Sequence, residues 1–286
     1  MADTLSTSDI DSTHATITQF TEPMWTWCWG SEPVIRRLQT AYGGQIRIEY
    51  VMGGLVKDFD DFYDAANGIS DPEDVAPHWL EASEIHGMPV DTRIFDVDPA
   101  QSTYPASVAF VAARQQDKQL AGQYLRALRE TYVTRVRNVN TREVQVELAA
   151  SVGLDVDEFV TALDDGSARS EFEDDLSRTR AAGVRAFPTY HIAGPNGERQ
   201  AAGFRSFDDL ESDLAAVTPM IEQSSPPPID QFVDKYGPVA TREIAEVYEM
   251  GHGKARQTLE SLADNGALDR ESRGNGLFWN TQGGEN

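Results

Sequence analysis

The sequence predicts a mixed α/β domain followed by a second, smaller module. A strand, a helix and another strand are predicted in succession within residues 15–54. A long helical stretch follows at about 58–183, and two short strands and a helix complete the domain by residue 221. Residues 222–228 predict a linker, and residues 229–280 predict three helices and a hairpin. This order of elements indicates the α/β class with a small additional module.

The first three elements form a strand–helix–strand unit. Apolar and polar side chains alternate in residues 15–22, ATITQFTE. The segment is also rich in β-branched side chains, so it is predicted to form a strand. Apolar side chains share one helical face in residues 28–44, and two glycines end that helix. Residues 45–54 predict the second strand. The helical crossover favours a parallel pair with a right-handed connection.

Helical periodicity dominates the insertion at 58–183. Apolar side chains recur three and four residues apart in several segments, namely 104–116, 120–137, 141–154 and 155–163. Residues 185–204 return to the β pattern, as two short strands joined by a Gly-Pro-Asn-Gly turn. An amphipathic helix at 206–217, capped by Ser206, closes the domain.

The C-terminal module begins after three consecutive prolines in the linker 222–228, EQSSPPP. Three short amphipathic helices precede a hairpin whose predicted tip is Gly274-Asn275-Gly276. That order is typical of a winged helix-turn-helix at 229–280. Residues 1–13 and 281–286 are predicted to be a disordered start and a tail.

Composition limits the classes of function. The 286 residues carry 47 acidic and 24 basic side chains, for a net charge of −23, and only four of the bases are lysines. This charge suits a salt-rich cytoplasm in which self-repulsion is screened, so we expect a halophilic source. The sequence shows neither a signal peptide nor an apolar run that could span a membrane. One cysteine and five scattered histidines predict a cytoplasmic protein without a metal, a cofactor or a membrane partner.

The stretch EPMWTWCWG, residues 22–30, holds the single cysteine, Cys28. It resembles the DsbA/FrnE family, whose site reads Asp-Pro-x-Cys-x-x-Cys-[Trp/Tyr]-Gly. Several features match that family in order, namely Pro23, Cys28, Trp29-Gly30, Pro33 and Phe187-Pro188-Thr189. The resemblance covers residues 14–220 and implies a thioredoxin fold with a DsbA-like helical insertion. It also implies a cis peptide bond before Pro188, close to the Trp25–Cys28 turn.

One position departs from this family. Trp25 stands where the family has its first, attacking cysteine. A cycle between two thiols is therefore excluded, because Cys28 has no partner in the chain. Cys28 is either a buried apolar residue or a catalytic monothiol. Trp25 is either a platform for a peptide, together with Trp27, Phe187, Pro188 and Thr189, or a plug that fills a dead site. Trp29 is expected to pack in the core.

A second resemblance concerns the whole chain. A domain of this family followed by a winged helix, with CWGSEPVIRRL at its site, is similar to the YjbH-type adaptors of the ClpXP protease. The resemblance implies a protein or peptide partner, such as a transcription factor and a protease. We therefore predict a protein-binding adaptor or regulator. The alternatives are a monothiol oxidoreductase or isomerase that uses Cys28, and a DNA-binding regulator that uses the winged helix.

The charges of the C-terminal module bear on the DNA alternative. Residues 226–286 carry ten acids and six bases, so DNA contact would depend on a local basic face. Four bases are predicted to lie outside the module's core: Lys254, Arg256, Arg270 and Arg273. The predicted core consists of Ile229, Phe232, Ile244, Tyr248, Leu259, Leu262 and Phe278. We expect Glu243, Glu246 and Glu260 to interrupt the basic face, or the larger domain to cover it.

Overall fold

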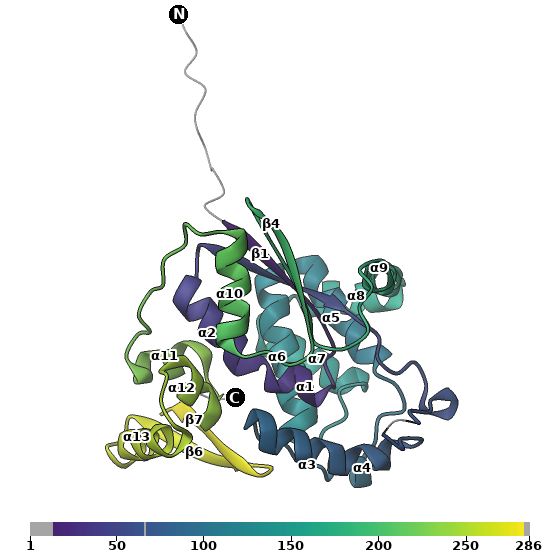
Figure 1. The fold of residues 1–286 in the computed structure, drawn as a ribbon. Helices are drawn as coiled ribbons and strands as arrows, with labels where there is room; N and C mark the ends of the chain where they lie inside the picture. The colour runs from purple at the N-terminus through teal and green to yellow at the C-terminus, as the bar shows by residue number, and fades with distance from the viewer. Residues whose placement is uncertain (1–13, 66, 283–286) are drawn as a thin grey trace, which may run out of the picture.

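A four-stranded mixed sheet lies at the centre of the larger domain in the computed structural model (Figure 1). The structure describes residues 14–65 and 67–282, so the predicted disordered start at 1–13 and most of the predicted tail lie outside it. The strand order is β2-β1-β3-β4. Their bounds are β1 Ala15–Thr21, β2 Ile46–Met52, β3 Thr189–Gly194 and β4 Gly197–Ala202.

The parallel pair that the sequence predicts is present. Strand β1 pairs in parallel with β2, and Ile17 lies opposite Ile48. On its other side β1 pairs antiparallel with β3, which forms a hairpin with β4. The connection from β1 to β2 consists of α1 (Thr26–Gly30) and α2 (Glu32–Tyr42), so the predicted single helix is divided at Ser31.

Helices α2 and α10 (Phe207–Val217) cover one face of the sheet (Figure 1). Leu38 of α2, Tyr190 of β3 and Leu214 of α10 belong to the same buried apolar cluster. The hydroxyl of Ser206 accepts a hydrogen bond from the backbone N–H of Asp209, which confirms the predicted cap of α10. Burial of these apolar side chains is the main force that holds both helices on the sheet.

Helices form most of the insertion between β2 and β3 (Figure 1), and the last of them packs beside β2. They are α3 (Val75–His86), α4 (Ile94–Val97), α5 (Tyr104–Gln116), α6 (Lys118–Thr134), α7 (Arg142–Ser151), α8 (Val156–Asp164) and α9 (Ser167–Ala181). The Arg114 guanidinium of α5 donates to the Tyr50 carbonyl of β2 and to Asp175 of α9. The α-helices of the insertion begin at Val75, and the described residues before it form 3₁₀ turns at Phe59–Asp61 and Pro72–Asp74. The expectation of helix from residue 58 is therefore wrong for this part.

The C-terminal module combines three helices with a three-stranded antiparallel sheet of order β5-β7-β6. Its elements are α11 (Ile229–Tyr236), β5 (Val239–Ala240), α12 (Thr241–Val247), α13 (His252–Asp264), β6 (Leu268–Arg273) and β7 (Gly276–Thr281). The three predicted helices and the hairpin are all present. The two-residue strand β5 was not predicted, because two residues are too few to show the alternation of apolar and polar side chains that indicates a strand.

The predicted core of the C-terminal module is wrong at one residue, Phe278. Phe232, Ile244 and Leu259 are fully buried there, as predicted, whereas Ile229, Tyr248 and Leu262 are partly buried at its edge. Phe278 lies on the opposite face of β7 and packs in the core of the larger domain. Its neighbour Trp279 fills the module's core instead. Successive side chains of a strand point to opposite faces of the sheet. Phe278 and Trp279 are adjacent in β7, so only one of them can enter the module's core.

Candidate functional site

Trp25 lies at the turn between β1 and α1, beside the loop that precedes β3. Its side chain is half-buried, and its indole Nε1–H donates a hydrogen bond to the Phe187 carbonyl oxygen at 3.1 Å. The next carbonyl along the loop, that of Pro188, accepts a hydrogen bond from the Gly203 N–H at 2.7 Å. Both carbonyl groups are therefore satisfied within the chain.

The peptide bond between Phe187 and Pro188 is cis, which confirms the prediction from sequence. Phe187 covers the end of β2, since a Cβ atom added to Gly53 would lie 2.0 Å from its ring. Pro188 and Thr189 are buried, and the Thr189 hydroxyl donates to the Ala186 carbonyl at 2.7 Å. The predicted peptide-binding residues Trp25, Phe187, Pro188 and Thr189 thus lie in one place, and these polar groups form hydrogen bonds within the chain.

Cys28 lies in the first turn of α1 and is completely buried. Burial raises the pKa of its thiol to about 11, although the Arg129 guanidinium opposes this shift. A thiol with such a pKa is almost entirely protonated at neutral pH, and the thiolate is the reactive form. Cys28 is therefore poorly suited to attack a disulfide or an electrophile.

This burial predicts slow chemistry at Cys28. In the folded protein at pH 8, we expect Cys28 to react with Ellman's reagent about 100-fold more slowly than in the urea-unfolded chain, because both access and thiolate fraction are reduced. The measurement is the time course of thionitrobenzoate release with and without urea. Rapid stoichiometric release from the folded protein would contradict the buried, protonated thiol.

The two following tryptophans have different surroundings. Trp29 is completely buried, donates from Nε1 to the Pro89 carbonyl at 2.8 Å, and stacks on Phe278 with ring centroids 6.4 Å apart. This confirms its predicted packing role. Trp27 is half-buried and contacts the rings of His86 and Phe204, each with a centroid distance of 5.9 Å. Trp27 therefore forms part of an aromatic group beside the Trp25 turn.

Beneath these residues lies a buried charge network, which consists of Glu32, Arg126, Arg129, Glu130, Glu243 and Arg273. Arg129 contacts Glu32 and the Thr21 hydroxyl. Arg126 donates to Glu243 of α12 at 2.9 Å, and its guanidinium lies 4.5 Å from the Trp29 ring centroid. Burial opposes ionisation of Glu32, but Arg129 and Arg126 outweigh it and lower the pKa of this carboxyl. The network joins the site to the C-terminal module.

Comparison with known proteins identifies the family. The family model described as Thioredoxin matches residues 19–212. The chain belongs to this thioredoxin family. The ClpXP adapter protein SpxH of Halalkalibacterium halodurans is 28% identical over 266 residues, which cover 91% of this chain and 86% of the relative. The SpxH of Bacillus subtilis is 26% identical over 269 residues, which cover 92% and 88%.

Solved structures show the same fold as this thioredoxin-family chain. The cytosolic disulfide reductase DsbM of Pseudomonas aeruginosa matches with a TM-score of 0.53 and 20% sequence identity. The match covers 70% of this chain and 93% of DsbM. This similarity supports a DsbA-like fold alone, because the identity is low.

The basic residues predicted for nucleic-acid contact do not share one surface in this thioredoxin-family protein. Lys254, Arg256 and Arg270 are exposed, and Arg256 pairs with Glu260 at 2.8 Å. Arg273 is buried and pairs with Glu130 of the larger domain. The prediction that Arg273 lies outside is therefore wrong, because the hairpin docks on α6 and places this charge at the junction.

Two titratable residues close to the site were not predicted from the sequence. Glu22 is completely buried, and its carboxylate accepts a hydrogen bond from the Leu55 N–H at 2.8 Å. Burial raises the pKa of Glu22 to about 7. His86 is also buried, which lowers its pKa to about 4. Its Nδ1 accepts from the Met88 N–H at 3.0 Å, so its other nitrogen donates to the Thr26 hydroxyl at 3.1 Å.

Neither residue carried a strong signal in the sequence. Glu22 is the last residue of the predicted strand and precedes Pro23 at the site, which could have marked it as a candidate. His86 lies far from the site along the chain. The described residues contain no group of histidine, cysteine or carboxylate side chains that could hold a metal ion. Within residues 14–65 and 67–282, no helix is long and apolar enough to cross a membrane.

Proposed function

We propose that this protein is a non-catalytic adaptor of the cytoplasm, which binds a client protein and presents it to a second protein such as a protease. The observation that carries the proposal is the closed site: the Trp25 indole donates a hydrogen bond to the Phe187 carbonyl, and Cys28 is buried. The similarity to ClpXP adapter proteins over most of the chain supports the same function.

We propose further that residues 229–280 are a winged helix that serves protein contact. The order α11, β5, α12, α13, β6, β7 supports this assignment. The hairpin tip contacts the larger domain through Asn275, whose side-chain carbonyl accepts from the Val90 N–H at 2.8 Å. A hairpin held in this way, with Arg273 paired inside the protein, is poorly placed to contact a DNA duplex. These contacts argue against the DNA-binding alternative.

The adaptor proposal is tested by the lifetime of client proteins in the source cell. Deletion of the gene is expected to lengthen the half-life of at least one protein, measured by pulse-labelling and mass spectrometry. The wild-type gene and a Cys28→Ala variant should both restore rapid turnover, because no thiol chemistry is required. Failure of a folded Cys28→Ala variant to restore turnover would favour the monothiol enzyme. If no half-life changes on deletion, the adaptor proposal fails.

The role of Trp25 can be tested in the same cells. We propose that Trp25 closes the loop edge, so a Trp25→Ala variant should support client turnover at the wild-type rate. The physical reason is that the Phe187 carbonyl, which a bound peptide would need, already accepts the indole N–H. Binding of a peptide by Trp25, Trp27, Phe187, Pro188 and Thr189 stays a prediction. Loss of turnover in folded Trp25→Ala would support that prediction and contradict closure.

A further inference from the structure

Exposed apolar side chains are concentrated in one part of the chain. Among the described residues, five large apolar side chains are exposed, and four of them lie within residues 63–97. These four are Tyr63, Leu80, Ile85 and Val97, whereas the fifth, Met220, follows α10. Single exposed apolar side chains are common on protein surfaces, but a concentration of them indicates a site of interaction.

Two of these side chains lie on α3, which runs along the lower edge of the molecule in Figure 1. One side of this helix is buried and includes Trp79 and His86. At about 3.6 residues per turn, residues three and four apart share one side of a helix. The exposed positions therefore form one face, called here the outer face of α3, which consists of Pro77, Leu80, Glu81, Glu84 and Ile85. On this face the two glutamates lie between Leu80 and Ile85.

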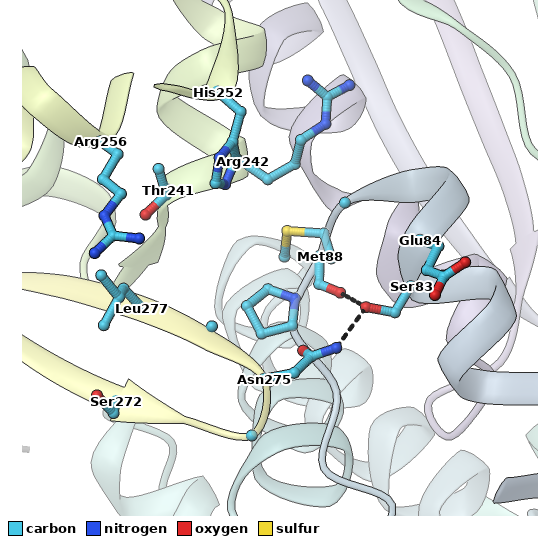
Figure 2. A pocket seen from close by; sticks show the side chains of 14 residues that line it. Ser83, Glu84, Met88, Thr241, Arg242, His252, Arg256, Ser272, Asn275 and Leu277 are labelled. Atoms are coloured by element: carbon cyan, nitrogen blue, oxygen red, sulfur yellow. Dashed lines mark hydrogen bonds between the residues drawn. The ribbon is translucent and has the colours of Figure 1, made fainter. Parts of the chain in front are cut away.

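Contacts on its inner side hold α3 in place. The Trp79 ring contacts that of Phe95 in α4, with a centroid distance of 4.8 Å. In the last turn of α3, the Ser83 hydroxyl accepts a hydrogen bond from the Asn275 side-chain amide at 3.1 Å (Figure 2). Both the larger domain and the C-terminal module therefore fix this helix, and its outer face is preformed for a partner.

The surroundings of this face are strongly acidic. Residues 57–98 contain twelve acidic and two basic side chains, so the segment has a net charge of −10, whereas the other 244 residues carry −13. The Glu81 and Glu84 carboxylates are exposed, and within residues 14–65 and 67–282 neither forms an ion pair or a hydrogen bond. One of the two bases, Arg93, is paired with Asp91 at 2.6 Å. The outer face of α3 thus offers free carboxylates between exposed apolar side chains.

We propose that the outer face of α3 binds a basic amphipathic helix of a partner protein, in which lysine or arginine side chains lie between apolar ones. The inference rests on the proposed adaptor function, because an adaptor needs a surface for each of its partners. Basic side chains would pair with Glu81 and Glu84, and apolar ones would cover Leu80 and Ile85. A helix fits this face because the ridges of one helix pack into the grooves of another. An extended peptide would need a sheet edge, which α3 does not provide.

The charge of the surface argues against other occupants. A second copy of the chain would place its own carboxylates opposite Glu81 and Glu84, and like charges repel. Nucleic acid and anionic lipid are repelled for the same reason. At high salt the charges are screened, and the apolar contacts of Leu80 and Ile85 maintain binding.

The test uses the full-length protein and a fluorescein-labelled helical peptide that carries leucines and lysines in this pattern, in a titration followed by fluorescence anisotropy. We expect this peptide to bind, and its counterpart with glutamate in place of lysine not to bind. Leu80→Ser/Ile85→Ser and Glu81→Lys/Glu84→Lys should each weaken binding about ten-fold. In about 1 M salt, the lysine substitutions should lose most of their effect and the serine substitutions should keep theirs.

Matched controls lie elsewhere on the surface. Met220→Ser removes an equally exposed apolar side chain, and Glu173→Lys/Asp174→Lys makes the same charge change on exposed positions of α9. Both variants should bind the peptide with wild-type affinity. Circular dichroism verifies that each variant is folded.

Three outcomes would overturn the inference: equal binding of both peptides, wild-type affinity in Leu80→Ser/Ile85→Ser, or a wild-type dimer that this variant dissociates, as measured by sedimentation velocity. The deletion strain separates the inference from the adaptor proposal. If Leu80→Ser/Ile85→Ser restores client turnover as well as the wild type does, the adaptor function stands and this face is not one of its partner sites. If the peptide binds at this face but deletion changes no half-life, the adaptor proposal alone fails. Loss of turnover in the folded variant supports both.

Discussion

Replacement of Arg126 by methionine is expected to lower the free energy of unfolding by about 3–5 kcal/mol, because it leaves buried carboxylates without their partner. Arg126 is nearly buried and lies between Glu243, at 2.9 Å, and Glu32, at 3.7 Å. Glu243 is completely buried. Methionine retains much of the side-chain volume, so the loss reports the charge contacts rather than a cavity. Urea unfolding followed by circular dichroism, at constant salt, measures the effect.

Two further variants make this result specific. The Arg126→Met/Glu243→Gln double variant should recover part of the loss, since it removes the uncompensated carboxylate together with its partner. Arg142→Met breaks the exposed pair with Asp164 and should cost less than about 1 kcal/mol. If Arg126→Met costs no more than Arg142→Met, the buried charge network does not hold the module on the larger domain.

Much of the fold could be predicted from local patterns. Segment 104–116 became α5 with identical bounds, and the Gly-Pro-Asn-Gly turn joins β3 to β4 as expected. The cis bond before Pro188 and its closeness to Trp25 followed from the family resemblance and are confirmed. These features depend on periodicity, turn residues and a short motif, all of which are local in the sequence.

The contacts between the two modules could not be predicted in this way. Phe278 and Trp279 are equally apolar neighbours, and only the docking of the hairpin decides which ring enters which core. The sequence around Arg273 is as polar as that around the exposed Arg270. Arg273, however, ends β6 beside α6, where it forms an ion pair with Glu130. A count of charges cannot distinguish the buried Arg273 from the exposed Arg270. The burial of such a residue depends on partners more than 100 positions away, which no local pattern records.

The composition of the chain also does not reveal which arginines are buried. The chain has 24 basic residues, yet Arg126, Arg129 and Arg273 are all buried in the network beneath the site. Arginine suits this position because its planar guanidinium can bond to two carboxylates at once and remains charged when buried. These three basic groups are buried together with three carboxylates, those of Glu32, Glu130 and Glu243, so their burial leaves the charge balance of the exterior unchanged.

Glu22→Gln is expected to change how stability depends on pH. Burial raises the pKa of Glu22 from 4.5 in the unfolded chain to about 7 in the folded protein. Above pH 4.5 the unfolded chain releases this proton while the folded protein keeps it, so the wild type loses stability as the pH rises to 7. The shift corresponds to about 3 kcal/mol, fully lost above pH 7. Glutamine does not titrate, so its variant should lack this loss.

The measurement is the free energy of unfolding in urea at several pH values between 4.5 and 8, for the wild type and Glu22→Gln. The difference between the two curves isolates Glu22, because His86, whose lowered pKa acts in the opposite direction, is present in both. One oxygen of Glu22 has no hydrogen-bond partner in the described structure, so the absolute stability of the variant is less informative than its slope. Glu173→Gln, at an exposed carboxyl, should follow the wild-type curve. Parallel curves for Glu22→Gln and the wild type would show that Glu22 is ionised in the folded protein.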